Sequence, residues 1–221
     1  LGMDNFSVFD RSRDVPEGWR LGQSDATSWM AFFSLTMLRI ALELSREDRA
    51  FDGLATTFLE HFLSVAEAME TFGTDDVSLW DEADGFSSDV LVGPDGHSQP
   101  VRLRALVGLL PLIAVAHAPD WITRELPDFV ARLRWLQRRR PDLTDALVTT
   151  RAEGQLVTSL APLTADRADA LLTRLFDEGE FLGPHGIRSL SAAYRGGVTL
   201  DVAGVSMSVA YDPGESTTNL F

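Results

Sequence analysis

The feature that most constrains the fold of this chain is an apolar segment over residues 26–45. Its large apolar side chains surround a helix on nearly every side: Trp29, Met30, Phe32, Phe33, Leu35, Met37, Leu38, Ile40, Leu42 and Leu44. A helix that is apolar all round is normally buried on all sides. The sequence therefore predicts an inner helix over residues 26–45, surrounded by a second layer of structure.

Residues 51–70 predict a second helix with a single apolar face. Apolar side chains recur there at steps of three and four, which places them on one stripe of a helix: Phe51, Leu54, Phe58, Phe62, Val65 and Met69. An inner helix followed by a one-sided helix is the order expected of an inner–outer helical pair.

The pattern of a buried helix and then an amphipathic helix returns later in the chain. Residues 102–118 predict a helix that is apolar nearly all round and kinked at Pro111. Residues 120–140 predict a one-sided helix that Pro141 ends, and residues 165–176 predict a further amphipathic helix.

The segments between these helices favour small β-structures. Residues 71–101 predict a β-hairpin with its turn at Pro94-Asp95-Gly96. Residues 198–211 alternate loosely around Gly204 and predict a second hairpin. Residues 142–162 carry a weaker pattern, which favours short helical or irregular structure.

The charge of the chain argues against two classes of partner. The formal net charge is −14 over 221 residues. Nucleic acids and anionic membrane surfaces need a basic binding face, so we expect neither as a partner. Every basic residue is Arg and none is Lys, which indicates the coding bias of a GC-rich genome.

Metal and cofactor sites are not expected. The chain contains no Cys, so it has neither disulfides nor thiolate ligands. The four His residues do not have the spacing of metal ligands. No segment is apolar enough to span a membrane and no signal peptide opens the chain. Leu1 indicates a cut end, so these two absences carry little weight. We expect a cytoplasmic protein.

Asp25 and the acids of the first hairpin have an ordinary structural explanation. Asp25 lies where a polar run meets the first helix, and a carboxylate there caps free backbone N–H groups and favours the helix dipole. The residues alone favour this cap over a catalytic acid. Four acids crowd the first hairpin, and without calcium-loop spacing they favour a solvated acidic loop: Asp81, Glu82, Asp84 and Asp89.

Five blocks of sequence are distributed along the whole chain: Leu1-Gly-Met-Asp-Asn-Phe-Ser-Val-Phe-Asp-Arg-Ser12, Gln23-Ser-Asp-Ala-Thr-Ser-Trp-Met30, Leu79-Trp-Asp-Glu-Ala-Asp-Gly-Phe86, Arg104-Ala-Leu-Val-Gly-Leu-Leu-Pro111 and Pro213-Gly-Glu-Ser216. In order and spacing these blocks resemble bacterial proteins of glycoside hydrolase family 63. This family includes mannosyl-oligosaccharide glucosidase and hydrolases of glucosylglycerate or mannosylglycerate.

The resemblance implies a mainly α fold. We expect residues 1–221 to form part of an (α/α)6-barrel catalytic domain with one or two small β-hairpins. A complete barrel needs roughly a dozen helices, so the resemblance also implies that N-terminal and C-terminal portions are missing. Such a part is expected to be inactive alone.

The resemblance also implies an inverting hydrolysis with one carboxylic acid and one carboxylate base. Their carboxyl groups lie about 6.5–9.5 Å apart in such enzymes, which leaves room for the attacking water. Asp25 matches the segment that carries the general acid of the family. The matching base is a Glu that we expect beyond Phe221, whereas Glu215 is expected to shape the sugar pocket.

Further residues are expected to bind the substrate, a small carbohydrate or oligosaccharide. Trp80 and Asp81 combine an aromatic face for the sugar ring with a carboxylate for its hydroxyls. Gln23 and Trp29 flank the acid, although Trp29 fits the core equally well. Arg104 is expected either to pair with a hairpin acid, Asp81 or Asp84, or to bind a glycerate carboxylate.

Two functions remain in view at this point. The first is an inverting glycosidase for an α-glucoside or α-mannoside, with Asp25 as its acid. The second is a non-catalytic helical module that binds sugar or serves as a scaffold, because a fold does not fix a function. Ser87-Ser88 and Ala26 depart from residues common in the family, which leaves the identity of the substrate open. The sequence also does not give the sugar linkage or the oligomeric state.

Overall fold

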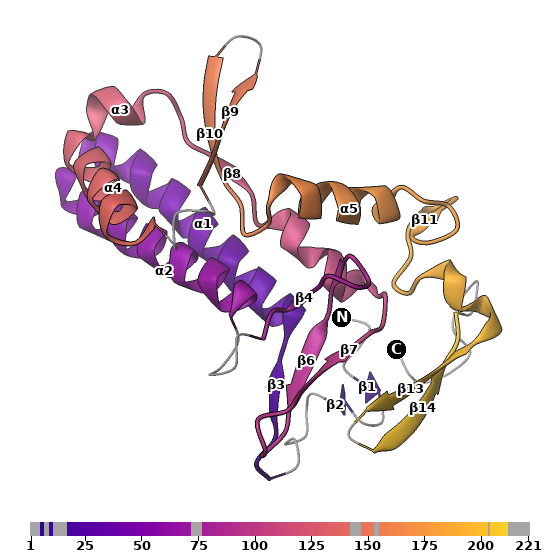
Figure 1. The fold of residues 1–221 in the computed structure, drawn as a ribbon. Coiled ribbons are helices and arrows are strands. Elements are labelled where there is room, and N and C mark those ends of the chain that lie inside the picture. Colours follow the sequence, from indigo (N-terminus) through magenta and orange to yellow (C-terminus); the bar gives the residue numbers. More distant parts are fainter. Residues whose placement is uncertain are drawn as a thin grey trace. The chain divides into compact units, whose positions relative to one another are not determined.

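The computed structural model describes residues 5–6, 9–10, 17–71, 77–141, 147–152, 155–202 and 204–211 of the chain (Figure 1). The chain divides into two compact units, each assembled from separate stretches. The β-rich unit consists of Leu1–Asp25, Thr71–Leu110 and Asp166–Phe221. The helical unit consists of Ala26–Glu70 and Pro111–Ala165.

Four α-helices and one small sheet make up the described part of the helical unit. The helices are α1 (Ser24–Glu47, whose first two residues belong to the β-rich unit), α2 (Asp52–Glu70), α3 (Ile122–Glu125) and α4 (Pro127–Arg139), with the 3-10 helix η1 (Arg49–Phe51) between α1 and α2. The antiparallel sheet has the order β8 (Ala116–His117), β10 (Gln155–Leu160), β9 (Leu147–Ala152).

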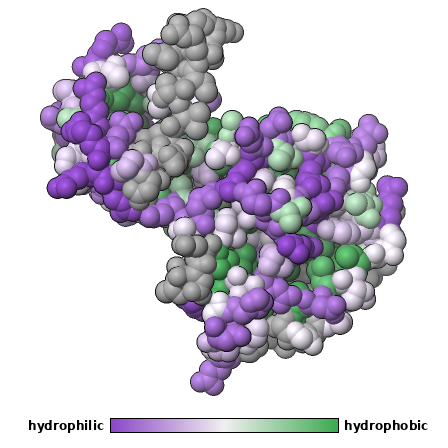
Figure 2. All heavy atoms as spheres, in the orientation of Figure 1, coloured by the Kyte–Doolittle hydropathy of each residue, from purple (hydrophilic) through white to green (hydrophobic). Residues whose placement is uncertain are grey.

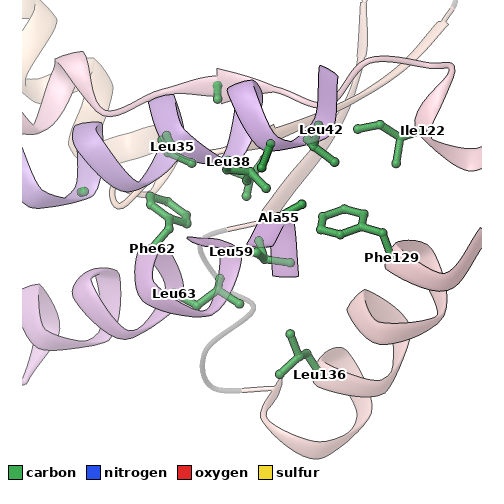
Figure 3. Close-up of a cluster of buried hydrophobic side chains, with 14 of the residues drawn as sticks. Leu35, Leu38, Leu42, Ala55, Leu59, Phe62, Leu63, Ile122, Phe129 and Leu136 are labelled. Carbon is green, nitrogen blue, oxygen red and sulfur yellow. The ribbon is translucent and has the colours of Figure 1, made fainter. Parts of the chain in front are cut away.

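The core of the helical unit lies where α1, α2, α3 and α4 meet. Figure 3 shows side chains of these four helices pointing toward one another, and all of those labelled are buried: Leu35, Leu38, Leu42, Ala55, Leu59, Phe62, Leu63, Ile122, Phe129 and Leu136. Each large side chain buried in this way contributes about 1.5–3 kcal/mol to folding. The predicted helix over residues 51–70 is confirmed, but only Phe62 and Met69 of its expected stripe are buried, and Leu54 is exposed. The buried side of α2 is turned toward Ala55, Leu59, Leu63 and Ala66.

Helix α1 confirms the predicted helix but not its expected burial on all sides. Its buried positions recur at helical spacing on one face, at Ala31, Leu35, Leu38 and Leu42. The opposite face exposes apolar side chains, among them Met30 at 54% and Phe33 at 52%. Figure 2 shows hydrophobic residues among hydrophilic ones on the face that it draws. The described helices therefore cover α1 on one side only.

The β-rich unit is centred on a three-stranded antiparallel sheet. Its order is β3 (Arg20–Gly22), β6 (Asp89–Val92), β7 (Ser98–Val101), so that β6 has a neighbour on both sides. All four side chains of β6 are buried. The turn between β6 and β7 contains Pro94-Asp95-Gly96, with Gly96 at φ 82°, which confirms the hairpin predicted there.

Short antiparallel pairs and helices complete the β-rich unit. The pairs are β1 (Asn5–Phe6) with β2 (Phe9–Asp10), β4 (Trp80–Asp81) with β5 (Phe86–Ser87), β11 (Leu182–Gly183) with β12 (Gly186–Ile187), and β13 (Val198–Val202) with β14 (Val205–Val209). The last pair confirms the second predicted hairpin. Helix α5 (Ala165–Leu175) begins the final stretch, and the 3-10 helix η4 (Ala192–Gly196) precedes β13. The Phe86 and Phe181 rings stack 5.8 Å apart in the core.

Three segments differ from the structure predicted for them. Residues 102–118 do not form an α-helix: they contain the 3-10 helix η2 (Leu106–Ile113), followed by strand β8. Pro111 lies inside η2 and cannot donate the backbone hydrogen bond of an α-helix. Within residues 142–162, expected to be short helical or irregular, Leu147–Ala152 and Gln155–Leu160 pair as strands β9 and β10. Within residues 120–140, Leu126 separates α3 from α4, where one helix was expected.

These differences overturn the expected (α/α)6 barrel. The described residues combine helices with several small antiparallel sheets, and they do not form a helical barrel. The second inner helix required for such a barrel is replaced by η2 and β8. Among the described residues, no helix has both the length and the apolar character needed to cross a membrane.

Candidate functional site

The predicted catalytic residue Asp25 lies at the start of α1. Strand β3 ends at Gly22, and α1 begins two residues later at Ser24. Asp25 is in the first helical turn and its exposed fraction is 8%. A carboxylate in this position is stabilised by the positive end of the helix dipole. The side chain is therefore held in a buried place and does not extend into bulk solvent.

A second buried carboxylate, Asp89, meets the same helix start. Asp89 is the first residue of β6 and has an exposed fraction of 6%. Its Oδ1 accepts a hydrogen bond of 2.8 Å from the backbone N–H of Ser24. The β3–β6 register pairs Gly22 with Val90, which brings Asp89 to the junction between β3 and α1.

The hairpin of Trp80 and Asp81 leads directly to Asp89. Trp80 pairs with Ser87 across the hairpin, and the Ser88 N–H donates to the Leu79 carbonyl at 2.9 Å. Trp80 is 7% exposed, and the Arg167 guanidinium lies 5.2 Å from its ring centre. A sugar cannot stack on the ring face that Arg167 covers.

Asp81 holds the turn of this hairpin in place. Its Oδ1 accepts hydrogen bonds from the backbone N–H groups of Ala83 at 2.9 Å and Asp84 at 3.3 Å. Its Oδ2 pairs with Arg102. Burial alone raises the pKa of Asp81, but the hydrogen bonds from Arg102 and the turn outweigh it, so the pKa lies below its ordinary value. Asp81 is thus ionised and rigidly positioned.

A small pocket of about 240 Å³ opens beside these residues. Its polar lining comes from Ser78, Asp81, Glu82 and Ser98, and Trp80 supplies an aromatic edge. Pockets for drug-sized ligands usually have volumes of about 300–1,000 Å³, so this one suits a smaller ligand. Asp25 is not among the residues that line it.

Arg104 is held by acidic side chains of its own unit. Its Nε donates to Asp84 Oδ1 at 3.1 Å, and its Nη1 donates to Glu180 Oε1 at 2.7 Å. Arg174 and Ser191 also bind Glu180. The hydrogen bond to Asp84 raises the pKa of Arg104. Of the roles considered for Arg104, the pair with Asp84 is formed, and the guanidinium is not open to a glycerate carboxylate.

The remaining predicted residues do not line this pocket or lie outside the described residues. Gln23 is half-buried between β3 and α1. Trp29 is 42% exposed in the helical unit, and its ring meets Phe32 edge-on at 5.8 Å. It is therefore not the fully buried core residue that was the alternative. Glu215 lies outside the described residues.

Searches for similar proteins give one informative match. No protein-family model and no solved structure matches the chain. The chain is 39% identical over 236 residues to the uncharacterized protein YMR196W of Saccharomyces cerevisiae. The match takes in 100% of this chain and 22% of the yeast protein, so the chain spans about a fifth of the length of that relative.

The structure adds residues that the sequence patterns did not single out for the site. Asp89 was grouped with a solvated acidic loop, yet it is buried and binds the start of α1. The sequence did contain a sign of this, because Asp89 directly precedes the apolar run Val90-Leu91-Val92. Within the described residues, no group of three His, Asp or Glu side chains could hold a metal ion.

Proposed function

We propose that this chain is part of a glycoside hydrolase that cleaves a small α-glucoside or α-mannoside with inversion. The observation that carries the proposal is the buried carboxyl of Asp25 at the N-terminus of α1. It lies in the block that resembles the general-acid segment of glycoside hydrolase family 63. A cytoplasmic location belongs to the same proposal.

In this mechanism Asp25 acts as the general acid. It donates its proton to the glycosidic oxygen as the bond to the anomeric carbon breaks. A carboxylate base removes a proton from the water that attacks the opposite face of the sugar. We assign the base to a Glu outside residues 1–221, and the greater length of the yeast relative leaves ample chain for it.

The pocket beside Asp81 suits the binding of one sugar ring. Its small volume and several hydroxyl and carboxylate groups fit a ligand rich in hydroxyls. Asp81 needs no rearrangement to accept hydrogen bonds from such a ligand, because the turn and Arg102 already fix it. Gln23, beside the acid, is a further contact in this proposal.

The proposal is tested by the Asp25→Asn variant of the full-length protein. Probes are glucosylglycerate, mannosylglycerate and an aryl α-glucoside, and the anomer released first is followed by NMR. We expect kcat to fall by about 10²–10⁴-fold, since Asn cannot donate the acid proton. The β-anomer should appear first in the wild type.

A matched control separates catalysis from helix capping. Asp128→Asn removes an exposed carboxylate from the first turn of α4, and it should leave kcat unchanged. Circular dichroism should give the same fold for both variants. Near-normal turnover by Asp25→Asn, or no hydrolysis of any probe by the wild type, would rule out the proposal.

One observation favours a second function, a sugar-binding module without hydrolysis. Asp25 does not line the pocket that holds Asp81 and Trp80. A module of this kind would bind the probes, measured by calorimetry, and would release no sugar. Asp81→Asn would weaken that binding, whereas Asp25→Asn would leave it unchanged.

A further inference from the structure

We propose that Asp89 is a positioning residue for Asp25. Its carboxylate fixes the first turn of α1 to the β3–β6–β7 sheet through the Ser24 N–H, and it thereby sets the place of the Asp25 carboxyl. This inference rests on the proposed function, because it presupposes that Asp25 is the acid.

Asp89 lies on a strand that is held on both sides by its neighbours in the sheet. It begins the central strand β6, where its backbone partner on β7 is Val101. The next three residues of β6 pair with all of β3, from Gly22 back to Arg20. Both sides of the strand are therefore occupied, and the four side chains of β6 are buried. A side chain on such a strand has little freedom to move.

The contact ties the helix start to a distant part of the chain. The first N–H groups of a helix lack partners within the helix and are usually capped by a neighbouring residue. Here the Ser24 N–H is bound by a carboxylate 65 residues away, at 2.8 Å. A hydrogen bond to an ionised acceptor is stronger than a neutral one, and the helix dipole adds to it.

The position of Asp25 follows from this anchor. Asp25 is the residue directly after Ser24, so a shift of the Ser24 N–H moves the Asp25 backbone with it. General acid catalysis requires the acid within hydrogen-bond reach of the leaving oxygen. A displacement of about 1 Å can reduce a rate by about 10²-fold. Loss of the anchor should therefore lower kcat without removing any group that touches the sugar.

The first test compares two changes at Asp89 in the full-length protein with the same sugar probes. Asp89→Ala removes the acceptor, and we expect kcat to fall by about 10²-fold while KM changes less than about threefold. Asp89→Asn retains an acceptor oxygen and should recover most of kcat. Val101→Ala truncates the buried partner of Asp89 in the same sheet, and it should lower stability while leaving kcat unchanged.

The second test removes the donor instead of the acceptor. Ser24→Pro lacks the N–H, and Pro is tolerated in the first turn of a helix. It should reproduce the kcat loss of Asp89→Ala. The double variant should lose no more than either single variant, because both changes break one contact.

The outcomes separate this inference from the proposed function. Active Asp25→Asn would overturn the proposed function and the inference with it. A second result would overturn the inference alone. In that case the Asp25→Asn variant is inactive, but the kcat of Asp89→Ala equals the kcat of Val101→Ala. Hydrogen exchange of the Ser24 amide gives a readout without substrate: it should accelerate in Asp89→Ala, and unchanged protection relative to Val101→Ala would refute the anchor.

Discussion

At the scale of single residues, the acids of the β-rich unit differ in what holds them. Asp84 and Glu180 are bound to the guanidinium of Arg104, and Asp81 to that of Arg102. Asp89 instead meets a backbone N–H at a helix start. Asp25 is buried in the first turn of this helix, which Asp89 contacts, and the proposed function and the further inference rest on these two acids.

The pair of Asp81 and Arg102 makes stability depend on pH. The pKa of Asp81 in the folded protein is below its ordinary value, because the hydrogen bonds from Arg102 and the turn outweigh the effect of burial. The pair therefore contributes its full stabilisation when the pH is above the pKa that Asp81 has in the unfolded chain. This contribution is lost as the pH falls through the pKa that Asp81 has in the folded protein. We expect Arg102→Gln to lower the free energy of unfolding at pH 7 and to match the wild type in strong acid.

Urea unfolding at several pH values measures this difference. Arg124→Gln replaces an exposed Arg on α3 and serves as the control. Its effect should be small throughout the range. A deficit for Arg102→Gln that stays constant from pH 7 down to about pH 2 would contradict the role given to the pair.

At the scale of elements, the contact between η2 and the β4–β5 hairpin sets a steric limit. Gly108 lies so close to this hairpin that a Cβ atom would overlap the Ser87 carbonyl oxygen and the Phe86 ring. Neither group can move easily, because Phe86 is buried and Ser87 pairs with Trp80. Gly108 is therefore required for packing, which also explains a Gly within an apolar run.

Gly108→Ala tests this limit. Overpacking of a buried site costs about 1–3 kcal/mol, so we expect a loss of that size in the free energy of unfolding. Gly53→Ala on α2 is the matched control, because nothing lies within 4 Å of its added Cβ. In a helix that change stabilises by up to about 1 kcal/mol. Equal effects of the two changes, measured by urea unfolding, would contradict the close contact.

Sequence periodicity identified some elements and missed others for a physical reason. Helices α2 and α5 have clean apolar stripes, and only one secondary structure fits that spacing. The run over residues 106–113 is apolar at almost every position. Such a run indicates that the segment is buried, but it does not indicate which secondary structure the segment forms. Residues 147–160 carry Thr149, Thr150 and Thr158 among apolar residues, a β-type content that the weak pattern there concealed.

At the scale of the whole molecule, the candidate site depends on contacts between distant parts of the chain. The sequence could mark Asp25 as a residue at a helix start. It could not pair Ser24 with Asp89, because that contact follows from the register of β3 on β6. Nor could it show that Arg104 is shared by Asp84 and Glu180, which come from different stretches of the β-rich unit.

The net charge leads to a prediction for the molecule as a whole. The chain has 33 acidic and 19 basic residues, an excess of 14 negative charges. Ion pairs with Arg neutralise some of the acidic side chains, and the negative charges of the other acidic side chains repel one another in the folded state. Salt screens charges separated by more than about 10 Å at 0.1 M, so it weakens this long-range repulsion more than the short ion pairs.

We therefore expect the melting temperature to rise when NaCl is increased from about 10 mM to about 150 mM. Each kcal/mol gained in the free energy of unfolding should raise the melting temperature by about 2–4 °C in a protein of this size. Glu47→Gln removes one exposed negative charge at the C-terminal end of α1, where the helix dipole also disfavours it. This variant should be more stable than the wild type in low salt and nearly equal to it in high salt. A melting temperature that falls as salt is added would mean that the Arg–carboxylate pairs outweigh the repulsion, and differential scanning calorimetry distinguishes the two results.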